Sequence, residues 1–161
     1  MLAPPRHTPS GMAATDLILE TFRFNGRLLS AGDRLVAKLG LTSARWQVLG
    51  AIAYSPAPET VARLARNMGL HRQGVQRIVN ELEKEGFVEF RSNPHHRRAS
   101  LVVLTARGRE VYEQAMRLQM PWINTLTEGI AAGDIALATQ ILRSLRARLE
   151  GQGRLEPENG D

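Results

Sequence analysis

Two short helical patterns follow one another between Glu59 and Leu82, and they constrain the fold more than any other feature of the chain. In both patterns, apolar residues recur at positions i, i+3, i+4 and i+7, which lie on one face of an α-helix. They are Val61, Leu64, Ala65 and Met68 in the first pattern and Val75, Ile78, Val79 and Leu82 in the second. Gly69 separates the two and can take the left-handed conformation that ends a helix. Two short helices joined by a tight glycine-containing turn predict a helix-turn-helix.

The outer face of the second helix carries side chains that can read DNA bases. With the apolar stripe facing inward, this face presents Arg72, Gln73, Gln76, Arg77 and Asn80, with His71 just before the helix. Arginine pairs with guanine edges in the major groove, and Gln and Asn pair with adenine edges. From Arg63 to Arg77 there are four arginines and no acidic residue, as expected of a surface that meets a polyanion. We therefore predict base contacts from this face; a solvated amphipathic helix is the alternative when the helix is taken alone.

A hairpin with a basic tip follows the second helix. Extended, β-branched and aromatic runs begin at Phe87 and end at Leu104, and they flank the turn-rich segment Arg91-Ser-Asn-Pro-His-His-Arg-Arg98. A basic loop beside a reading helix can reach phosphates or the minor groove. The hairpin therefore predicts further DNA contacts, from His95, Arg97 and Arg98; an ordinary polar loop is the alternative.

The order of these features resembles the MarR family of winged-helix regulators. The resemblance rests on LEKEGFV at 82–88, on Arg97-Arg98-Ala99 and on LTARG at 104–108. It implies a mainly α fold with a small β-hairpin wing: a winged helix-turn-helix flanked by long N- and C-terminal dimerisation helices. The wing of the family usually carries two Asp residues and an Arg at its tip. Here both acids are missing and His95 stands at the tip position, so the Asp–Arg pairing that stiffens the family's wing cannot form as usual.

Helical stripes and chain breakers divide the sequence into five segments. We expect, in order, a flexible arm at 1–12, an N-terminal dimerisation helix at 13–40, a winged helix-turn-helix DNA-binding domain at 41–104, C-terminal dimerisation helices at 105–151 and a disordered tail at 152–161. Thr15 or Asp16 is expected to cap the first helix and Asp134 the last, and Pro121 should kink the helix that contains it. The end helices carry more apolar surface than the small winged-helix core can cover, which predicts a homodimer. A monomer with a self-contained helical cap is the alternative.

Together with the resemblance, these features predict a sequence-specific transcription regulator that binds double-stranded DNA as a homodimer on a pseudo-palindromic operator. Repression is expected to be steric, because a dimer on a promoter excludes polymerase. The resemblance also implies release by a small aromatic or anionic effector, for which Phe22, Trp46 and Tyr54 are candidate pocket residues. The alternative is a winged-helix protein-interaction module without sequence-specific DNA binding.

The composition excludes other classes of protein. The chain of 161 residues has a net charge of +5 and no cysteine, which removes disulfides, thiolate catalysis and thiolate zinc sites. The sequence has neither a glycine-rich phosphate loop nor carboxylates paired for acid–base work, so we expect no enzymatic activity, no cofactor and no metal. A zinc site is the alternative, with His7, His71, His95 and His96 and Glu side chains as its ligands. Because neither a membrane-spanning run nor the apolar core of a signal peptide is present, a cytoplasmic location is expected.

Overall fold

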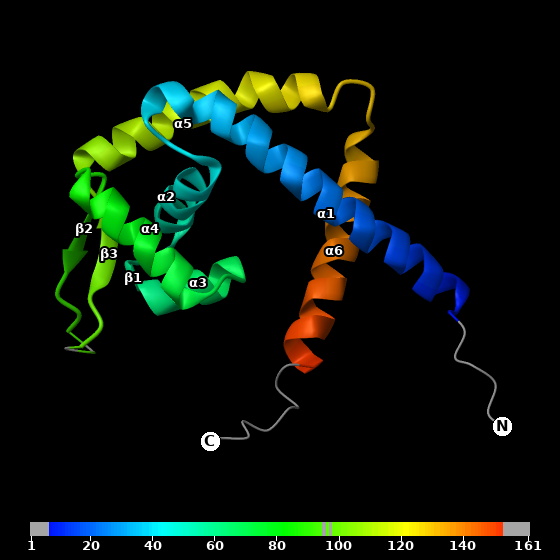
Figure 1. The fold of residues 1–161 in the computed structure, drawn as a ribbon, viewed down its shortest axis with the longest axis horizontal. Coiled ribbons are helices and arrows are strands. Elements are labelled where there is room, and N and C mark those ends of the chain that lie inside the picture. The colour runs from blue at the N-terminus through cyan, green and yellow to red at the C-terminus, as the bar shows by residue number, and fades with distance from the viewer. Residues whose placement is uncertain (1–6, 95, 97, 153–161) are drawn as a thin grey trace. The chain divides into compact units, whose positions relative to one another are not determined.

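The computed structural model describes residues 7–94, 96 and 98–152. The elements in chain order are α1 (Pro9–Val36), the 3-10 helix η1 (Ala37–Leu39), α2 (Ser43–Tyr54), β1 (Glu59–Thr60), α3 (Val61–Met68), α4 (Arg72–Lys84), β2 (Val88–Arg91), β3 (Leu101–Leu104), α5 (Ala106–Leu126) and α6 (Ala132–Gln152) (Figure 1). The chain forms two compact units, Met1–Met120 and Pro121–Asp161, whose boundary falls within α5. The predicted fold class, mainly α with a small β wing, is confirmed.

The helix-turn-helix forms as its two apolar stripes predict. Every predicted stripe residue is buried except Met68, which is partly buried against the same core. Gly69 ends α3 in the left-handed conformation, with φ 66°, and the N–H of Leu70 donates to the carbonyl of Ala65 at 2.9 Å. Gly86, with φ 76°, follows the end of α4. The inner faces of α3 and α4 pack with Val48 and Leu49 of α2 in one core.

The wing belongs to a three-stranded antiparallel sheet with strand order β1-β3-β2. The predicted hairpin forms between β2 and β3, with Val88 opposite Leu104 and Arg91 opposite Leu101. Strand β1 was not predicted, because two residues are too few to leave a periodic pattern. Its second residue, Thr60, also caps α3, since its Oγ1 accepts the N–H of Arg63 at 3.4 Å.

Helix α1 begins at Pro9, four residues before its expected start. The reason is local. The Thr8 Oγ1 accepts the N–H of Gly11 at 3.0 Å and so caps the helix. Proline is also favourable at the first helical position, because the N–H that it lacks would have no partner within the helix there. Thr15, expected as a cap, lies inside the helix and donates its hydroxyl to the Gly11 carbonyl at 2.9 Å. Helix α1 therefore includes the last four residues of the expected arm, whose first six residues lie outside the described part of the chain, as do residues 153–161 of the expected tail.

The last helix also starts earlier than expected. Helix α6 begins at Ala132, and Asp134 lies in its first turn rather than at its cap. A carboxylate is still favourable there, because the first turn carries partial positive charge from its free N–H groups. Among the described residues, no helix is both long and apolar enough to cross a bilayer.

A close contact at Gly108 joins α5 to the start of β2. A Cβ at this position would lie far inside van der Waals contact with the carbonyl oxygen of Phe87. The hydroxyl of Thr105 donates to the Gly86 carbonyl at 2.7 Å and accepts the N–H of Gly108 at 3.0 Å, so one side chain caps α5 and binds the turn that follows α4. Only glycine permits this approach of two backbones.

A similar contact at Gly32 joins α1 to α2. A Cβ there would collide with the hydroxyl of Ser43. That hydroxyl donates to the Leu29 carbonyl at 2.8 Å, and the N–H of Ser43 donates to Asp33 Oδ1 at 2.6 Å. Each of the two helices that flank the winged-helix core is therefore attached to it by a glycine and a hydroxyl.

We expect Gly108→Ala to lower the free energy of unfolding by about 3 kcal/mol, because the methyl group overpacks a backbone contact that cannot yield. Urea unfolding followed by circular dichroism measures the change. Gly26→Ala is the matched control, since Gly26 lies in α1 with open space around it. The control should raise the free energy of unfolding by up to about 1 kcal/mol through helix propensity. Equal effects of the two substitutions would contradict the close-contact interpretation.

Candidate nucleic-acid interface

The exposed face of α4 carries the side chains that were predicted to read bases. Four of the predicted residues are exposed on this helix, and the fifth, Gln76, is partly buried. All five predicted residues line one shallow depression on α4: Arg72, Gln73, Gln76, Arg77 and Asn80. Glu81 and Lys84 line the same depression. His71 is the N-cap residue of α4; its side chain is exposed and makes no capping hydrogen bond. It therefore lies at the margin of the face, as expected.

A groove of about 330 Å³ lies between α4, the start of α3 and the wing. Arg72 and Gln76 line it from α4, and Arg98 lines it from the wing, so residues from two separate sequence motifs meet in one place. The start of α3, at Thr60 to Ala62, Phe90 of β2, and Ala99 and Ser100 of the wing complete the lining. The free N–H groups of a helix start favour anions, and arginine favours phosphate oxygens. The contribution of α3 and Ser100 could not be found from the sequence, because it depends on how the wing folds back.

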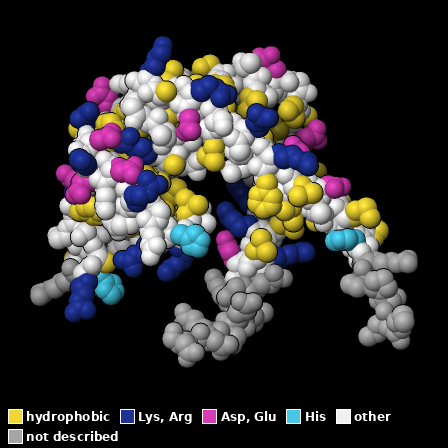
Figure 2. Space-filling view, in the orientation of Figure 1, with side chains coloured by type: hydrophobic (Ala, Val, Ile, Leu, Met, Phe, Trp, Pro, Cys, Tyr) yellow, Lys and Arg dark blue, Asp and Glu magenta, His cyan; other side chains and the backbone are white. Residues whose placement is uncertain are grey.

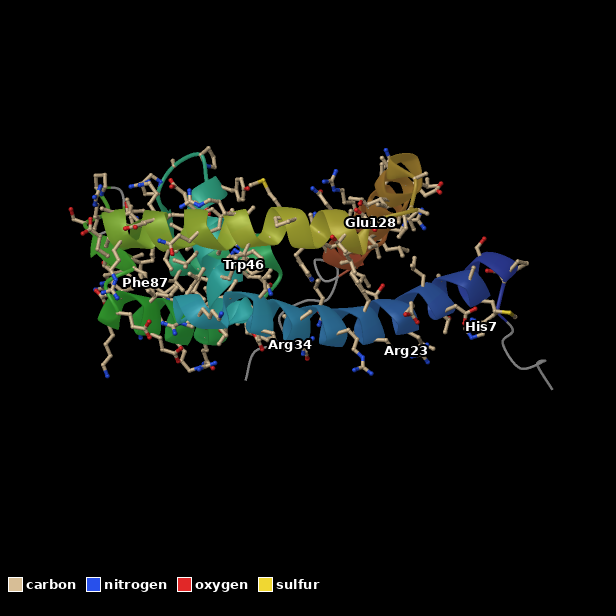
Figure 3. All side chains as sticks on the ribbon, turned by 90° about the horizontal axis from the view of Figure 1, so that it is seen from above. His7, Arg23, Arg34, Trp46, Phe87 and Glu128 are labelled. Carbon is tan, nitrogen blue, oxygen red and sulfur yellow. The ribbon has the colours of Figure 1, made fainter. Side chains whose placement is uncertain are left out.

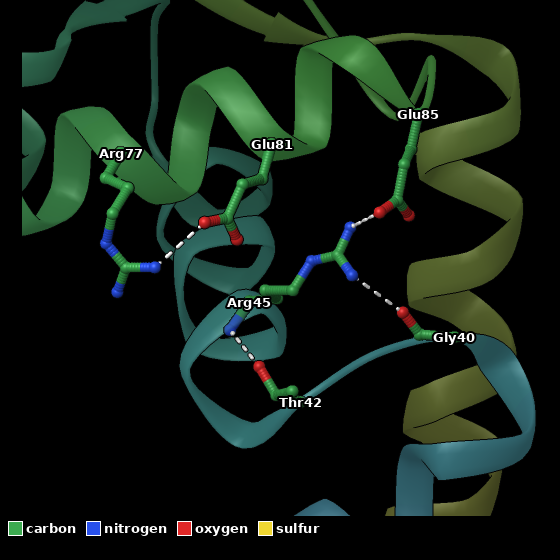
Figure 4. Close-up of polar contacts among 6 residues, drawn as sticks. All are labelled: Gly40, Thr42, Arg45, Arg77, Glu81 and Glu85. Atoms are coloured by element: carbon green, nitrogen blue, oxygen red, sulfur yellow. Dashed lines mark hydrogen bonds and ion pairs between the residues drawn. The ribbon is translucent and has the colours of Figure 1, made fainter.

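Side chains on the reading face pair with one another. Gln76 Nε2 donates to Asn80 Oδ1 at 2.9 Å, and Arg77 Nη1 lies 2.8 Å from Glu81 Oε1 (Figure 4). The Arg77 and Glu81 side chains are 72% and 43% exposed. Exposed pairs of this kind contribute only about 0.3–0.5 kcal/mol each. A base edge or phosphate can therefore replace the partner at small cost.

The wing is closed by an asparagine where the resembling family has an acidic residue. Asn93 Nδ2 donates to the carbonyl of Ala99 at 3.0 Å, and the N–H of His96 donates to the Asn93 carbonyl at 3.3 Å. The first of these bonds joins the two sides of the tip without an Asp–Arg pair. Arg98 is exposed beside it, whereas His95 and Arg97 lie outside the described residues.

Basic side chains lie at several places on the first unit, among them its edge beside the wing. In the view of Figure 2, Lys and Arg occupy the lower edge of the winged-helix part, whereas most Asp and Glu side chains lie higher. Like charges placed along one edge raise the local attraction for a polyanion.

Among the described residues, no group of three or more His, Cys, Asp or Glu side chains is placed to hold a metal ion.

Arg45 holds the C-terminal end of α4. Its Nη2 lies 2.5 Å from Glu85 Oε1, at the C-cap of α4, and its Nη1 donates to the Gly40 carbonyl at 3.0 Å (Figure 4). The Arg45 side chain is only 14% exposed, so this ion pair is less screened by solvent than the others on the helix. Three elements meet at one guanidinium: the turn after η1, the start of α2 and the end of α4. Nothing in the local sequence pattern identifies this role.

The three candidate effector residues lie on separate elements. Phe22 is 70% exposed on α1, and Trp46 lies on α2 against the core, between α1 and α5 (Figure 3). Tyr54 is exposed at the end of α2 and meets Tyr112 edge-on, with ring centroids 6.2 Å apart. Burial and then a hydrogen bond with Tyr54 raise the pKa of Tyr112. Among the described residues, no hydrogen bond or ring contact joins the three candidates, so an effector pocket built from them stays a prediction.

The chain is similar to known regulators along most of its length. The sequence model of the MarR family matches residues 39–99. An uncharacterized protein of Mycobacterium tuberculosis is 34% identical over 136 residues, which cover 84% of this chain and 94% of that protein. The transcriptional activatory protein BadR of Rhodopseudomonas palustris is 30% identical over 147 residues, which cover 89% of this chain and 82% of BadR.

Solved structures share the fold. CouR from Rhodococcus jostii RHA1 bound to p-coumaroyl-CoA matches with a TM-score of 0.73 at 24% identity, over 82% of this chain and 92% of CouR. The transcriptional repressor CouR bound to a 23-mer DNA duplex matches with a TM-score of 0.72 at 22% identity, over 88% of this chain and 99% of that one. At these identities the likeness establishes the fold.

We expect Arg45→Met to lower the free energy of unfolding by about 2 kcal/mol, because Glu85 and the Gly40 carbonyl lose a shared, mostly buried partner. Thermal and urea unfolding measure the loss. Arg23→Met is the control: Arg23 pairs with Glu20 at 3.3 Å, but both side chains are about 70% exposed. The control should change the free energy of unfolding by less than about 0.5 kcal/mol. A loss no larger than that of the control would show that the guanidinium does not fix α4.

Proposed function

The chain belongs to the MarR family of transcription regulators, and from this premise we propose that it binds double-stranded DNA sequence-specifically, as a homodimer on a pseudo-palindromic operator. The observation that carries the proposal is the groove where Arg72 and Gln76 of α4 meet Arg98 of the wing. Side chains with hydrogen-bond donors and acceptors, such as Gln76 and Asn80, face outward from α4, and the guanidinium group of Arg98 lies beside them in the wing. This arrangement suits a helix that contacts base edges in the major groove while the wing binds phosphates.

Each contact has a proposed part. Arg72, Gln73, Gln76 and Arg77 face base edges, and His71 and Asn80 lie at the margins of the reading face. Arg98 holds phosphate or enters the minor groove, and we propose the same for His95 and Arg97. The wing bond from Asn93 to Ala99 supports this role, because a tip closed on itself presents its basic side chains with less loss of entropy on binding.

Exposed apolar surface supports the dimer. Helix α1 leaves large apolar side chains between 46% and 70% exposed, namely Met12, Ile18, Leu19, Phe22 and Phe24. The second unit, by itself, exposes another set: Leu126, Ile130, Ile135, Leu137, Ile141, Leu142 and Leu149. Apolar surface of this extent marks an interface in a soluble protein. A second copy, with the same two sets, is the partner that we propose.

The proposed dimer presents two copies of α4 to the same face of the duplex. Repression follows if the operator overlaps a promoter, because the bound dimer excludes polymerase and needs no further contact. BadR carries the name of an activator, so activation from an operator outside the promoter is the second candidate. A small aromatic or anionic effector is proposed to act by binding one spacing of the two reading helices better than the other, since only differential affinity moves an equilibrium.

A winged helix that binds protein instead of DNA is the competing interpretation. The exposed face of α4 argues against protein binding, because its side chains are polar and form only weak pairs with one another. Protein interfaces instead favour a desolvated apolar centre. Salt dependence separates the two: DNA binding falls steeply as salt rises.

Selection of bound duplexes from random DNA by the purified chain should recover two half-sites related by a two-fold axis. Their centres should lie about 34–36 Å apart, or a multiple of this spacing, because two copies of α4 must enter the major groove from one side. Sequencing of the bound pool measures both symmetry and spacing. Enrichment of a single asymmetric site would contradict the dimer, and no enrichment over the starting pool would contradict sequence-specific binding.

Variants of the reading helix and of the wing should fail in different ways. Gln76→Ala or Arg77→Ala should cost about 1–3 kcal/mol on the selected site and little on random duplex, because base contacts are lost. Arg98→Ala should weaken both alike and reduce the slope of log K against log salt by about 1, since one phosphate contact is lost. Fluorescence anisotropy at several salt concentrations measures these effects. Arg23→Ala on α1, whose side chain is 71% exposed, removes the same charge and should change neither. Full base preference in the α4 variants would contradict the assigned reading face.

A further inference from the structure

The depression on α4 contains a carboxylate, that of Glu81, to which the proposed base contacts give no role. Among the described residues that line the depression, Glu81 is the one acid, and it stands against three cations: Arg72, Arg77 and Lys84. DNA carries a negative charge on every phosphate, so a carboxylate on this face opposes binding to the backbone. Any contribution of Glu81 to DNA recognition must therefore come through a neighbouring side chain.

Glu81 holds the guanidinium of Arg77 by one of its nitrogens. Arg77 Nη1 donates to Glu81 Oε1 at 2.8 Å (Figure 4). The two residues stand one turn apart, and the buried side chains of Ile78 and Leu82 fix the rotation of α4, so both charged groups lie on its outer side. Lys84 is also close to one turn from Glu81, but no ion pair joins these two described residues. Glu81 is therefore placed against Arg77 in particular.

The other nitrogens of the Arg77 guanidinium are open to a ligand. Nε and Nη2 make no hydrogen bond to any described residue, and the side chain is 72% exposed. A guanidinium carries five N–H donors in one plane, so a carboxylate on Nη1 leaves the Nε–Nη2 edge with two parallel donors. Guanine presents two matching acceptors, N7 and O6, in the major groove. A guanine edge can therefore bind Arg77 without displacing Glu81.

A phosphate gains much less from the paired arginine. The charges of Arg77 and Glu81 lie 2.8 Å apart, so their effects on a more distant charge nearly cancel. To use the full charge of Arg77, a phosphate must displace Glu81 and leave the carboxylate unpaired beside a polyanion. The pair is weak in water, but this displacement adds repulsion between the freed acid and the duplex. The pair therefore disfavours phosphate contacts more than guanine contacts.

We propose that Glu81 is a positioning residue that raises the specificity of DNA binding. It holds Arg77 back from the phosphate backbone and presents the Nε–Nη2 edge of the guanidinium to guanine. The inference rests on the proposed function, since it requires that this face of α4 binds duplex DNA. It adds a residue that lowers affinity for all sequences and lowers it most for the wrong ones.

The experiment compares two Kd values of the full-length chain, one for the duplex selected from random DNA and one for a random-sequence duplex of the same length. Fluorescence anisotropy at several salt concentrations measures both. Glu81→Gln removes the charge and keeps the size of the side chain. The variant should bind the random duplex about threefold to tenfold more tightly, with a salt slope steeper by about 1 for each copy of the chain bound, because Arg77 then reaches phosphate. The selected duplex should gain less, so discrimination should fall by a factor of about three or more.

Failure of this inference differs from failure of the proposed function. A parent chain that binds no duplex, or that prefers no sequence, would overturn the proposed function and the inference with it. A parent chain that discriminates between the two duplexes, together with a Glu81→Gln variant that discriminates equally well, would overturn the inference alone.

Glu83→Gln is the matched control for charge. Glu83 is an exposed acid two residues further along α4 and does not line the depression. Its replacement should change the Kd for each duplex by less than about twofold and leave discrimination as it was. If both variants lose discrimination to the same extent, the effect comes from the net charge of the chain, and the proposal is wrong. Thermal unfolding of both variants should show little change, because exposed charges contribute little to stability.

A second background tests whether Glu81 acts through Arg77. When Arg77→Ala is already present, adding Glu81→Gln should change discrimination by less than about twofold, because there is no guanidinium left to position. The two substitutions should therefore be strongly non-additive in a double-mutant cycle. A full effect of Glu81→Gln in the absence of Arg77 would show that the carboxylate acts on the duplex directly, and the assigned positioning role would be wrong.

Discussion

The backbone contact between Gly108 and Phe87 is the constraint on which the arrangement of the proposed DNA-binding surface depends. It fixes the start of α5 against β2, and the Thr105 hydroxyl continues the attachment to Gly86, directly after the reading helix. At the other flank, Gly32 and Ser43 attach α1 to α2 in the same manner. Because α1 and α5 lead into the surfaces proposed for dimerisation, rigid attachments would convert the geometry of the proposed dimer into the spacing of its two α4 helices. An elastic joint at either place would let that spacing vary and would weaken discrimination among operators.

The two sides of α4 are held in contrasting ways. Its inner stripe is buried, and its end is tied by Arg45 through a mostly shielded ion pair. On its outer side, Gln76 pairs with Asn80 and Arg77 with Glu81, in exposed contacts of small energy. Because the backbone of α4 is held rigidly, little conformational entropy is lost when the helix binds. Because the outer pairs are weak, little interaction energy is lost when a ligand displaces them. Both conditions favour a surface whose own partners are exchanged for those of DNA.

The features that were predictable from sequence are those with a local cause. Stripe spacing placed α3 and α4, and Gly69 and Gly86 marked their ends, because helix periodicity and left-handed glycine are properties of short segments. The Arg and Gln face followed from the stripe, since it is the opposite side of the same helix. The early start of α1 was missed although its cause is local: Thr8 and Pro9 form a cap that competes with the one expected at Thr15. Strand β1, the Arg45 contact and the Gly108 approach were not predictable, because each depends on residues that are distant in sequence and adjacent only in the fold.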